Sequence, residues 1–227
     1  MAAPGASDTV VVVTGGDPVA RSHLPTLPLG TRVIAADSGI EHAHALGLVV
    51  DLAIGDFDSV SPEALAHASA EGATVERHPV AKDATDLELA LDAALAMRPA
   101  RVLVLGGHGG RLDHLLANAL LLAAPAYAAV EVTAQMGAAR VTVVRSEAHL
   151  TGPLGDLVSL MALHGPANGV TTRGLLYPLT GEDLVPGSTR GVSNELVHEE
   201  AAVTVGGGVL VAVQPGQIGT HHQETPR

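Results

Sequence analysis

Short apolar runs alternate with amphipathic segments between Val10 and about Val144, and this alternation constrains the fold more than any other feature of the sequence. Continuous apolar runs separated by helical segments are typical of parallel strands that helices cover on both faces. The predicted strands are Val10–Thr14, Arg32–Ala36, Leu52–Ile54, Thr74–Arg77, Val102–Leu105 and Val130–Thr133. The predicted helices lie near 39–47, 62–71, 86–97 and 111–123. The pattern therefore predicts an α/β domain built on a mostly parallel sheet.

Two of the predicted helices carry start signals. Ser61 is an N-cap followed by proline at the first helical position, and Thr85 to Glu88 matches a capping box. The most apolar stretch, Leu115 to Val130, is shorter than the ~20 residues that a membrane-spanning helix needs and is interrupted by polar and proline residues. We interpret that stretch as a buried helix followed by a strand.

After about Ser146 the rhythm changes to short strands between glycine and proline turns, without a convincing helix. The predicted strands are Leu157–Leu163, Gly169–Thr172, Ala201–Val205 and Val209–Val213. Gly206-Gly207-Gly208 is interpreted as a hairpin turn, and residues from Gln217 onward as a loose tail. We therefore predict an α/β domain over 1–145 and a smaller all-β domain over 146–227, although Arg140–Val144 fits either one.

Composition excludes several classes of function. The chain has 24 Asp and Glu against 12 Lys and Arg, a formal charge of −12, and too few aromatic residues for a base-stacking platform, so nucleic acid is not an expected partner. Without cysteine there can be no disulfide and no thiolate nucleophile. No secretion signal or membrane span is recognised, which predicts a cytoplasmic protein. The twelve histidines show no regular metal spacing, and His42 and His44 are interpreted as surface residues.

Aspartates follow two of the predicted strands. Asp37 comes after Arg32–Ala36, and Asp56 and Asp58 come after Leu52–Ile54. Ligands of open α/β sheets bind beyond the carboxyl ends of the strands, so these side chains are expected to converge there. Helix capping would also explain an aspartate in such a loop. At Asp56 and Asp58 a hard metal ion is the better explanation, because two carboxylates one residue apart repel each other unless a cation lies between them.

The only lysine of the chain, Lys82, begins a second acidic cluster with Asp83 and Asp86. Asp86 can be explained as a first-turn carboxylate that the helix dipole favours, whereas Asp83 has no evident structural task. Lys82 could neutralise a phosphate or simply offset the neighbouring acids.

Glycine-rich turns follow two other predicted strands. Gly106 to Gly110 leads from a strand into a helix, where exposed backbone N–H groups suit phosphate, but it matches neither a Walker A loop nor a dinucleotide fingerprint. Arg111, His114 and Asn118 would share one stripe of that helix. Thr14 to Asp17 could approach a nucleotide through its glycines, although turn formation alone would explain them.

Six short motifs, taken in order over roughly residues 11–215, resemble the thiamine pyrophosphokinase (thiamine diphosphokinase) family. They are Ala36-Asp37-Ser38-Gly39, Gly55-Asp56-Phe57-Asp58-Ser59, Lys82-Asp83-Ala84-Thr85-Asp86-Leu87, Gly110-Arg111-Leu112-Asp113-His114, Gly174-Leu175-Leu176-Tyr177-Pro178-Leu179 and Ser193-Asn194. The resemblance implies that the α/β domain over 1–145 is catalytic and binds the nucleotide, and that the domain over 146–227 is a thiamine-binding β-sandwich. The resemblance implies a homodimer as well, with thiamine held near the subunit interface. It also implies Mg²⁺-dependent transfer of the pyrophosphoryl group from ATP to the hydroxyethyl oxygen of thiamine, giving thiamine diphosphate and AMP.

The same resemblance, with the chemistry of phosphoryl transfer, suggests the role of each site residue. Magnesium would be held by Asp56, Asp58 and Asp83. Catalysis would depend on Asp58, Asp83, Arg111 and Asp113. ATP would contact Gly15, Gly16, Asp37, Lys82, Thr85, Asp86, Gly107, Gly110, Arg111 and His114. Thiamine would contact Tyr177, Ser193 and Asn194. Leu112 departs from the family pattern, which often has an aromatic residue before this aspartate.

Three other functions remain open from the sequence. Asp56-Phe57-Asp58-Ser59 after an apolar strand imitates the nucleophile motif of haloacid-dehalogenase-like phosphatases, although two predicted strands precede it. A related pyrophosphokinase could act on another alcohol, such as a hydroxymethylpterin. A non-catalytic nucleotide-binding sensor could use the same cleft.

Overall fold

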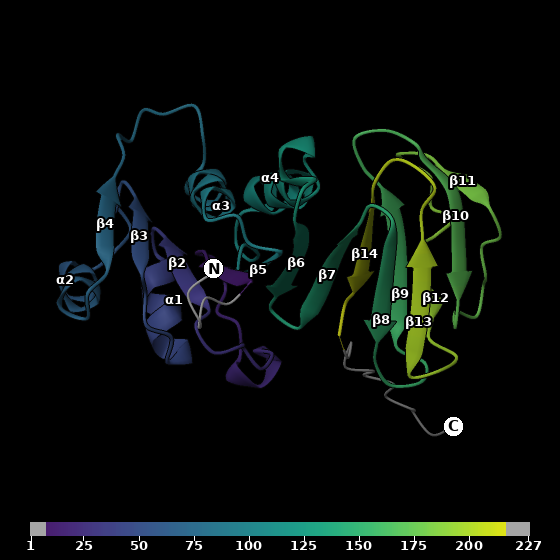
Figure 1. Ribbon diagram of the computed structural model, residues 1–227, viewed down its shortest axis with the longest axis horizontal. Helices are drawn as coiled ribbons and strands as arrows, with labels where there is room; N and C mark the ends of the chain where they lie inside the picture. The colour runs from purple at the N-terminus through teal and green to yellow at the C-terminus, as the bar shows by residue number, and fades with distance from the viewer. Residues whose placement is uncertain (1–7, 217–227) are drawn as a thin grey trace, which may run out of the picture.

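A ten-stranded sheet runs through the computed structural model, which describes residues 8–216 (Figure 1). Its strand order is β12-β9-β14-β7-β6-β5-β1-β2-β3-β4. The six strands that pair in parallel are β1 (Thr9–Val13), β2 (Arg32–Ala36), β3 (Leu52–Gly55), β4 (Thr74–Arg77), β5 (Arg101–Leu105) and β6 (Glu131–Met136). All six predicted strands of the first domain are therefore present, to within a few residues at their ends.

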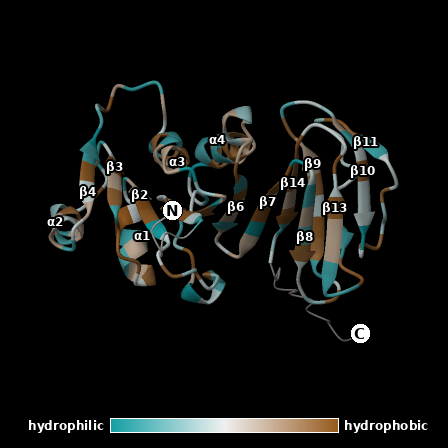
Figure 2. Ribbon diagram, viewed as in Figure 1, coloured by the Kyte–Doolittle hydropathy of each residue, from teal (hydrophilic) through white to brown (hydrophobic). Residues whose placement is uncertain are grey.

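Helices cover both faces of the parallel part. They are α1 (Gly39–Leu46), α2 (Pro62–Ala70), α3 (Asp86–Ala96) and α4 (Leu112–Leu122), with short 3₁₀ helices η1 (Arg21–His23) and η2 (Pro125–Tyr127). Along β1, Val11 and Val13 point into the core shared with α1 and α2, whereas Val10 and Val12 point into the core shared with α3 and α4. Apolar residues consequently continue along the central strands, and polar residues gather in the loops at their ends (Figure 2).

The C-terminal part is a sandwich of two antiparallel layers. One layer extends the large sheet with β7 (Ala139–Val144), β9 (Leu157–Ala162), β12 (Asn194–Glu195) and β14 (Leu210–Gln214). The other is a separate sheet of order β11-β10-β13-β8, formed by β8 (Glu147–Thr151), β10 (Ala167–Arg173), β11 (Glu182–Leu184) and β13 (Glu200–Thr204). Buried residues such as Leu150, Leu160, Val203 and Leu210 fill the space between the layers. The predicted fold class, α/β with an all-β sandwich, is confirmed.

Two local predictions are wrong. Gly206-Gly207-Gly208 does not close a hairpin, because β13 and β14 belong to different sheets and the glycines carry the chain from one layer to the other. The helix within Leu115 to Val130 is buried along one face only: Leu122 is buried in the core, but Leu116 is 57% exposed and Leu120 is 48% exposed. The predicted tail from Gln217 lies outside the described residues.

The large sheet is continuous across the predicted domain boundary. β7 pairs with β6 of the α/β part and with β14 of the sandwich, so residues on either side of position 145 share one sheet. The division into 1–145 and 146–227 stays a prediction, although each part has a core of its own. Within residues 8–216, no helix has the length and apolar character needed to cross a bilayer.

Candidate active site

The loops after β1 and β5 meet at the point where the strand order reverses. From β1 the chain builds β2, β3 and β4 on one side, and β5 and β6 lie on the other, which is where open α/β sheets bind ligands. The Asp17 N–H donates to the His108 carbonyl (2.7 Å), and the Gly107 N–H donates to the Gly15 carbonyl (2.8 Å). Gly16 has φ +105°, and a Cβ there would collide with the His108 carbonyl oxygen. Glycine therefore allows the two loops to pack together.

A cavity of about 460 Å³ lies beside these loops. Nine of the ten residues predicted to bind ATP line it: Gly15, Gly16, Asp37, Thr85, Asp86, Gly107, Gly110, Arg111 and His114. A larger cavity of about 910 Å³ lies against β6 and β7, but no predicted site residue lines it, and all of those residues are within the described part of the chain. The smaller cavity is thus the candidate active site.

Three aspartates form a compact group at the carboxyl ends of β2 and β3. Each of Asp37, Asp56 and Asp58 offers a carboxylate oxygen, and these oxygens lie within 4.8 Å of one another. The backbone is tightly folded here, because Gly55 has φ +149° and a Cβ there would lie 3.1 Å from Asp86 Oδ1. Asp37 itself has φ 47°, an uncommon conformation for a residue with a side chain. The strand ends therefore hold several acids close together, as the sequence predicts.

Lys82 joins this group to the start of α3. Its Nζ donates to Asp56 Oδ2 (2.9 Å) and to Asp86 Oδ1 (2.7 Å). Burial disfavours the ammonium, but the hydrogen bonds to Asp86 and Asp56 outweigh that effect and raise the pKa of Lys82. The hydrogen bond from Lys82 also lowers the pKa of Asp56. The lysine therefore stays charged and holds two carboxylates that would otherwise repel each other.

Asp37 is the electrostatically least favourable member of the group. Burial raises its pKa, and the negative charges of Asp86, Asp56 and Asp58 raise it further, against the lowering effect of the Ser38 backbone hydrogen bond. Its Oδ1 is buried and has no hydrogen-bond partner within residues 8–216. A buried acceptor without a partner calls for an ion or a water molecule.

The donor set fits a hard divalent cation. It consists only of carboxylate oxygens, and a bound cation would offset the repulsion among them while supplying the missing partner of Asp37. The group differs from the predicted ligands at one position. It contains Asp37, which was predicted only to contact ATP, and it lacks Asp83, which was predicted as a ligand and is exposed. The role of Asp83 as a ligand stays a prediction.

Arg111 and Asp113 pair at the start of α4. The guanidinium of Arg111 donates through Nη2 to Asp113 Oδ2 (2.6 Å) and through Nε to Asp113 Oδ1 (3.2 Å). Hydrogen bonding to Arg111 lowers the pKa of Asp113 to about 2. Asn118, buried one turn further on, donates to the Gly107 carbonyl (2.9 Å) and so fixes the glycine-rich loop on the helix. Both Arg111 and Asn118 line the cavity.

The three residues predicted to bind thiamine lie together in the sandwich. Asn194 is buried, its Oδ1 accepts from the Tyr177 N–H (2.9 Å), and its Nδ2 donates to the Tyr177 carbonyl (2.7 Å). This amide therefore fixes the backbone of Tyr177, whose ring is 57% exposed. The neighbouring Ser193 is exposed, with φ 57°. None of these three residues, all within the described part of the chain, lines the cavity at the switch point.

Several cavity residues were not assigned from the sequence. Ser38 and Ser59 lie inside recognised motifs, and Asp17 follows the first glycine turn, but no role was given to them. Their positions in or beside these motifs were the sequence feature that could have identified them as site residues. Only the folded chain shows that they line the same cavity as His108, whose ring packs against the backbone of Gly137.

Comparisons with known proteins assign the chain to a family. Residues 30–134 match the family model for the thiamin pyrophosphokinase catalytic domain, and residues 141–210 match the one for the thiamin pyrophosphokinase vitamin B1 binding domain. The chain is 28% identical over 221 residues to the thiamine pyrophosphokinase of Bacillus subtilis strain 168, covering 91% of this chain and 98% of that protein.

Solved structures agree with the sequence matches. A thiamine pyrophosphokinase from Bacillus subtilis superposes with a TM-score of 0.80 at 26% identity, covering 92% of this chain and all of that one (100%). A thiamin pyrophosphokinase family protein from Enterococcus faecalis gives a TM-score of 0.75 at 30% identity, covering 91% of this chain and 98% of the other. With both halves matched, the conclusion is that this chain belongs to the thiamin pyrophosphokinase family.

Proposed function

We propose that the protein transfers the pyrophosphoryl group of ATP to the hydroxyethyl oxygen of thiamine, giving thiamine diphosphate and AMP. Its relatives are named thiamine pyrophosphokinase, and its C-terminal half matches a vitamin B1 binding domain. The observation that supports the reaction best is the cavity at the switch point, where glycine-rich loops adjoin a group of carboxylates and a partly buried lysine. Neither the comparisons nor residues 8–216 favour a phosphatase, a sensor or a pterin-specific enzyme over this activity.

ATP is placed along the cavity by backbone and cationic groups. The loops at Gly15 and Gly107 let a nucleotide approach the backbone closely, and the start of α4 directs N–H groups toward negative charge. Arg111 can exchange its exposed partner Asp113 for phosphate oxygens, since a guanidinium binds either group through paired hydrogen bonds. Lys82 supplies a fixed positive charge at the acidic end.

Asp37, Asp56 and Asp58 would hold a divalent cation, which we assign as Mg²⁺ because it prefers oxygen ligands and needs few carboxylates beside substrate phosphates. Bound Mg²⁺ would neutralise charge on the phosphate oxygens as it develops in the transition state. Asp83 could take part through water, as expected from the sequence, because it is exposed beside Lys82.

In the chemical step, the thiamine hydroxyl oxygen forms a bond to the β-phosphorus, and the bond from that phosphorus to the oxygen shared with the α-phosphorus breaks. The electron pair of the broken bond stays on that oxygen, AMP leaves, and the hydroxyl proton passes to solvent water. Asp113, released when Arg111 binds phosphate oxygens, is assigned to accept a hydrogen bond from the thiamine hydroxyl and so orient it. Most of the rate enhancement would come from positioning and from charge stabilisation rather than from a covalent intermediate.

The acceptor site requires a second subunit. Tyr177, Ser193 and Asn194 are in the sandwich and do not line the cavity that Asp37 and Asp86 line, so within one chain the two halves of the site do not share a cavity. The exposed leucines of α4 and the exposed ring of Tyr177 offer apolar surface for contact between copies. We therefore infer a homodimer in which Tyr177 of one subunit stacks on the thiamine held at the acids of the other.

The direct test is incubation of the purified protein with ATP, Mg²⁺ and thiamine, with AMP and thiamine diphosphate followed by chromatography. Equal amounts of the two products are expected. A parallel reaction with a hydroxymethylpterin tests the acceptor, and AMP formed only there would reject the thiamine assignment. Free phosphate without AMP would indicate a phosphatase, and thiamine binding without any product would indicate a sensor. We expect the reaction to take place in the cytoplasm, where ATP is available.

A further inference from the structure

A second group of ligand-type side chains lies where the ends of α1 and α2 meet. His44 is in the last turn of α1, His67 is in the last turn of α2, and Glu71 is the C-cap residue of α2. The two helices pack side by side (Figure 1). The imidazole rings of His44 and His67 are 4.7 Å apart between centroids and meet edge to face. His44, interpreted from the sequence as a surface residue, is in fact half-buried, with its ring against that of His67.

The distances within this group match those around a metal ion better than those of hydrogen bonds. His44 Nε2 lies 3.6 Å from Glu71 Oε2, and His67 Nε2 lies 3.6 Å from Glu71 Oε1. Hydrogen bonds between nitrogen and oxygen are shorter, about 2.7–3.2 Å. Two ligand atoms on one tetrahedral zinc ion, each about 2.0–2.2 Å from the metal, are about 3.3–3.6 Å apart. Both imidazole nitrogens therefore face one carboxylate at nearly the spacing of a shared ion.

One of these nitrogens also lacks a partner. Nε2 of His44 is buried and has no hydrogen-bond partner within residues 8–216. Buried polar atoms are nearly always satisfied by protein, water or an ion. An ion placed between His44, His67 and Glu71 would satisfy this atom and would also account for the convergence of all three donor atoms, which lie within 4.8 Å of one another.

We propose that His44, His67 and Glu71 form a binding site for a first-row transition-metal ion of the zinc type, with water completing the coordination. Two imidazoles and one carboxylate suit Zn²⁺ and its neighbours, whereas the all-carboxylate group at Asp37, Asp56 and Asp58 suits hard cations. The ion would tie the ends of α1 and α2 together. His44 is in the last turn of α1, whereas Asp37 precedes the first residue of that helix, and none of His44, His67 and Glu71 lines the cavity at the switch point, so the ion would lie away from the substrates.

The test is a titration of metal-free protein with ZnCl₂ by calorimetry, with excess Mg²⁺ present to occupy the acidic group. The wild type is expected to bind one equivalent, and His67→Gln and Glu71→Gln are expected to weaken binding at least about tenfold. Zn²⁺ should raise the unfolding temperature of the wild type and not that of His67→Gln. His67 is exposed, so His67→Gln should fold normally, which circular dichroism checks.

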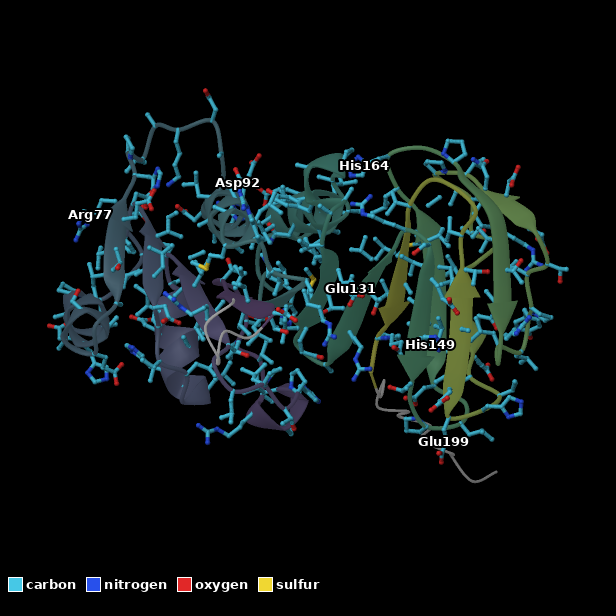
Figure 3. The ribbon with its side chains drawn as sticks, in the orientation of Figure 1. Arg77, Asp92, Glu131, His149, His164 and Glu199 are labelled. Atoms are coloured by element: carbon cyan, nitrogen blue, oxygen red, sulfur yellow. The ribbon has the colours of Figure 1, made fainter. Side chains whose placement is uncertain are left out.

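The matched control is His149→Gln. His149 Nε2 also lies 3.6 Å from a glutamate, Glu147, on the same strand, β8. His149 lies in the sandwich (Figure 3), and this pair is in neither of the two three-residue donor groups found within residues 8–216. Zinc binding should be unchanged in this variant. Equal zinc affinity in the wild type, His67→Gln and Glu71→Gln would overturn the proposal. Loss of the bound zinc equivalent in a variant elsewhere would also overturn it, whether in His149→Gln, in Asp58→Asn or in a variant that replaces His221 and His222. Turnover with Mg²⁺ should persist in His67→Gln, so failure here is distinct from failure of the proposed reaction.

Discussion

At the scale of single residues, the carboxylates of the cation site lower the stability of the folded protein when no cation is bound. Burial raises the pKa of Asp37, so the folded protein holds that proton more tightly than the unfolded chain does. The stabilising contribution of the group is thus complete below the unfolded pKa of 3.8 and is lost as the pH rises through the higher folded pKa. At neutral pH the ionised Asp37 therefore destabilises the fold.

Asp37→Asn is expected to raise the unfolding temperature of metal-free protein at pH 7, by on the order of a few degrees. The difference from the wild type should shrink as the pH is lowered toward the pKa of Asp37. Mg²⁺ should stabilise the wild type more than the variant, because the variant has lost a ligand. Thermal unfolding in chelator and in Mg²⁺ measures both effects. A variant that unfolds at a lower temperature than the wild type in chelator would contradict this account.

Asp58→Asn is expected to reduce kcat at least about a hundredfold while leaving the fold intact, because a metal ligand supports several kcal/mol of transition-state stabilisation. Steady-state formation of AMP measures the loss, and circular dichroism checks the fold. Glu63→Gln, which removes one exposed charge from α2, is the control and should retain full activity. Near-full activity in Asp58→Asn would remove Asp58 from the metal site.

Tyr177→Ala is expected to raise the KM for thiamine about tenfold, the loss of a cation–π contact of about 1–2 kcal/mol, with little change in the KM for ATP. Tyr177→Phe keeps the ring and should behave nearly as the wild type. Because the hydrogen bonds between Asn194 and Tyr177 involve the backbone of Tyr177 and not its side chain, neither substitution should disturb the loop. An unchanged KM for thiamine would place Tyr177 outside the acceptor site.

At the scale of elements, the loop that carries Asp58 is anchored by the start of α2. The Ser61 hydroxyl accepts from the Ala64 N–H (3.2 Å), and the Ser61 N–H donates to Glu41 of α1 (3.2 Å). The hydrogen bond from the Ser61 N–H, with a further one from the Ser61 side chain, lowers the pKa of Glu41. Capping thus fixes both where α2 begins and how it meets α1.

Ser61→Ala is expected to lower the free energy of unfolding by about 1 kcal/mol, the usual cost of losing an N-cap, and the unfolding temperature by about 2–4 °C. Denaturant titration measures the change. Ser69→Ala, at an exposed position near the other end of the same helix, should have little effect. Equal losses in both variants would mean that the hydroxyl of Ser61 does not act as a cap.

At the scale of the whole molecule, the proposed site belongs to two chains, and complementation tests this. In a heterodimer of Asp58→Asn and Tyr177→Ala subunits, one site carries both changes and the other carries neither. A random 1:1 mixture formed by co-expression should therefore recover about a quarter of the wild-type activity at low thiamine, since half of the dimers have one native site. Activity no greater than that of the separate variants would indicate that each site lies within one chain.

Much of this molecule could be predicted from local pattern. Continuous apolar runs identified the parallel strands, capping residues identified the starts of α2 and α3, and aspartates after strands identified the acidic group, because these features depend on neighbours in the chain. Nine of the predicted nucleotide residues line one cavity for the same reason, since the carboxyl ends of parallel strands share one edge of the sheet.

Pairing between distant segments was decided only by the tertiary structure. The strand pattern around Gly206 is the same whether β14 pairs with β13 or crosses to β7 and β9, so periodicity could not reveal the ten-stranded sheet. Likewise, His44 and His67 carry no motif, and only the packing of α1 on α2 brings them to Glu71. The sequence by itself thus determined the elements and the chemistry at their ends, whereas tertiary packing determined which surfaces and side chains meet, because long-range contacts depend on how whole elements bury their apolar faces.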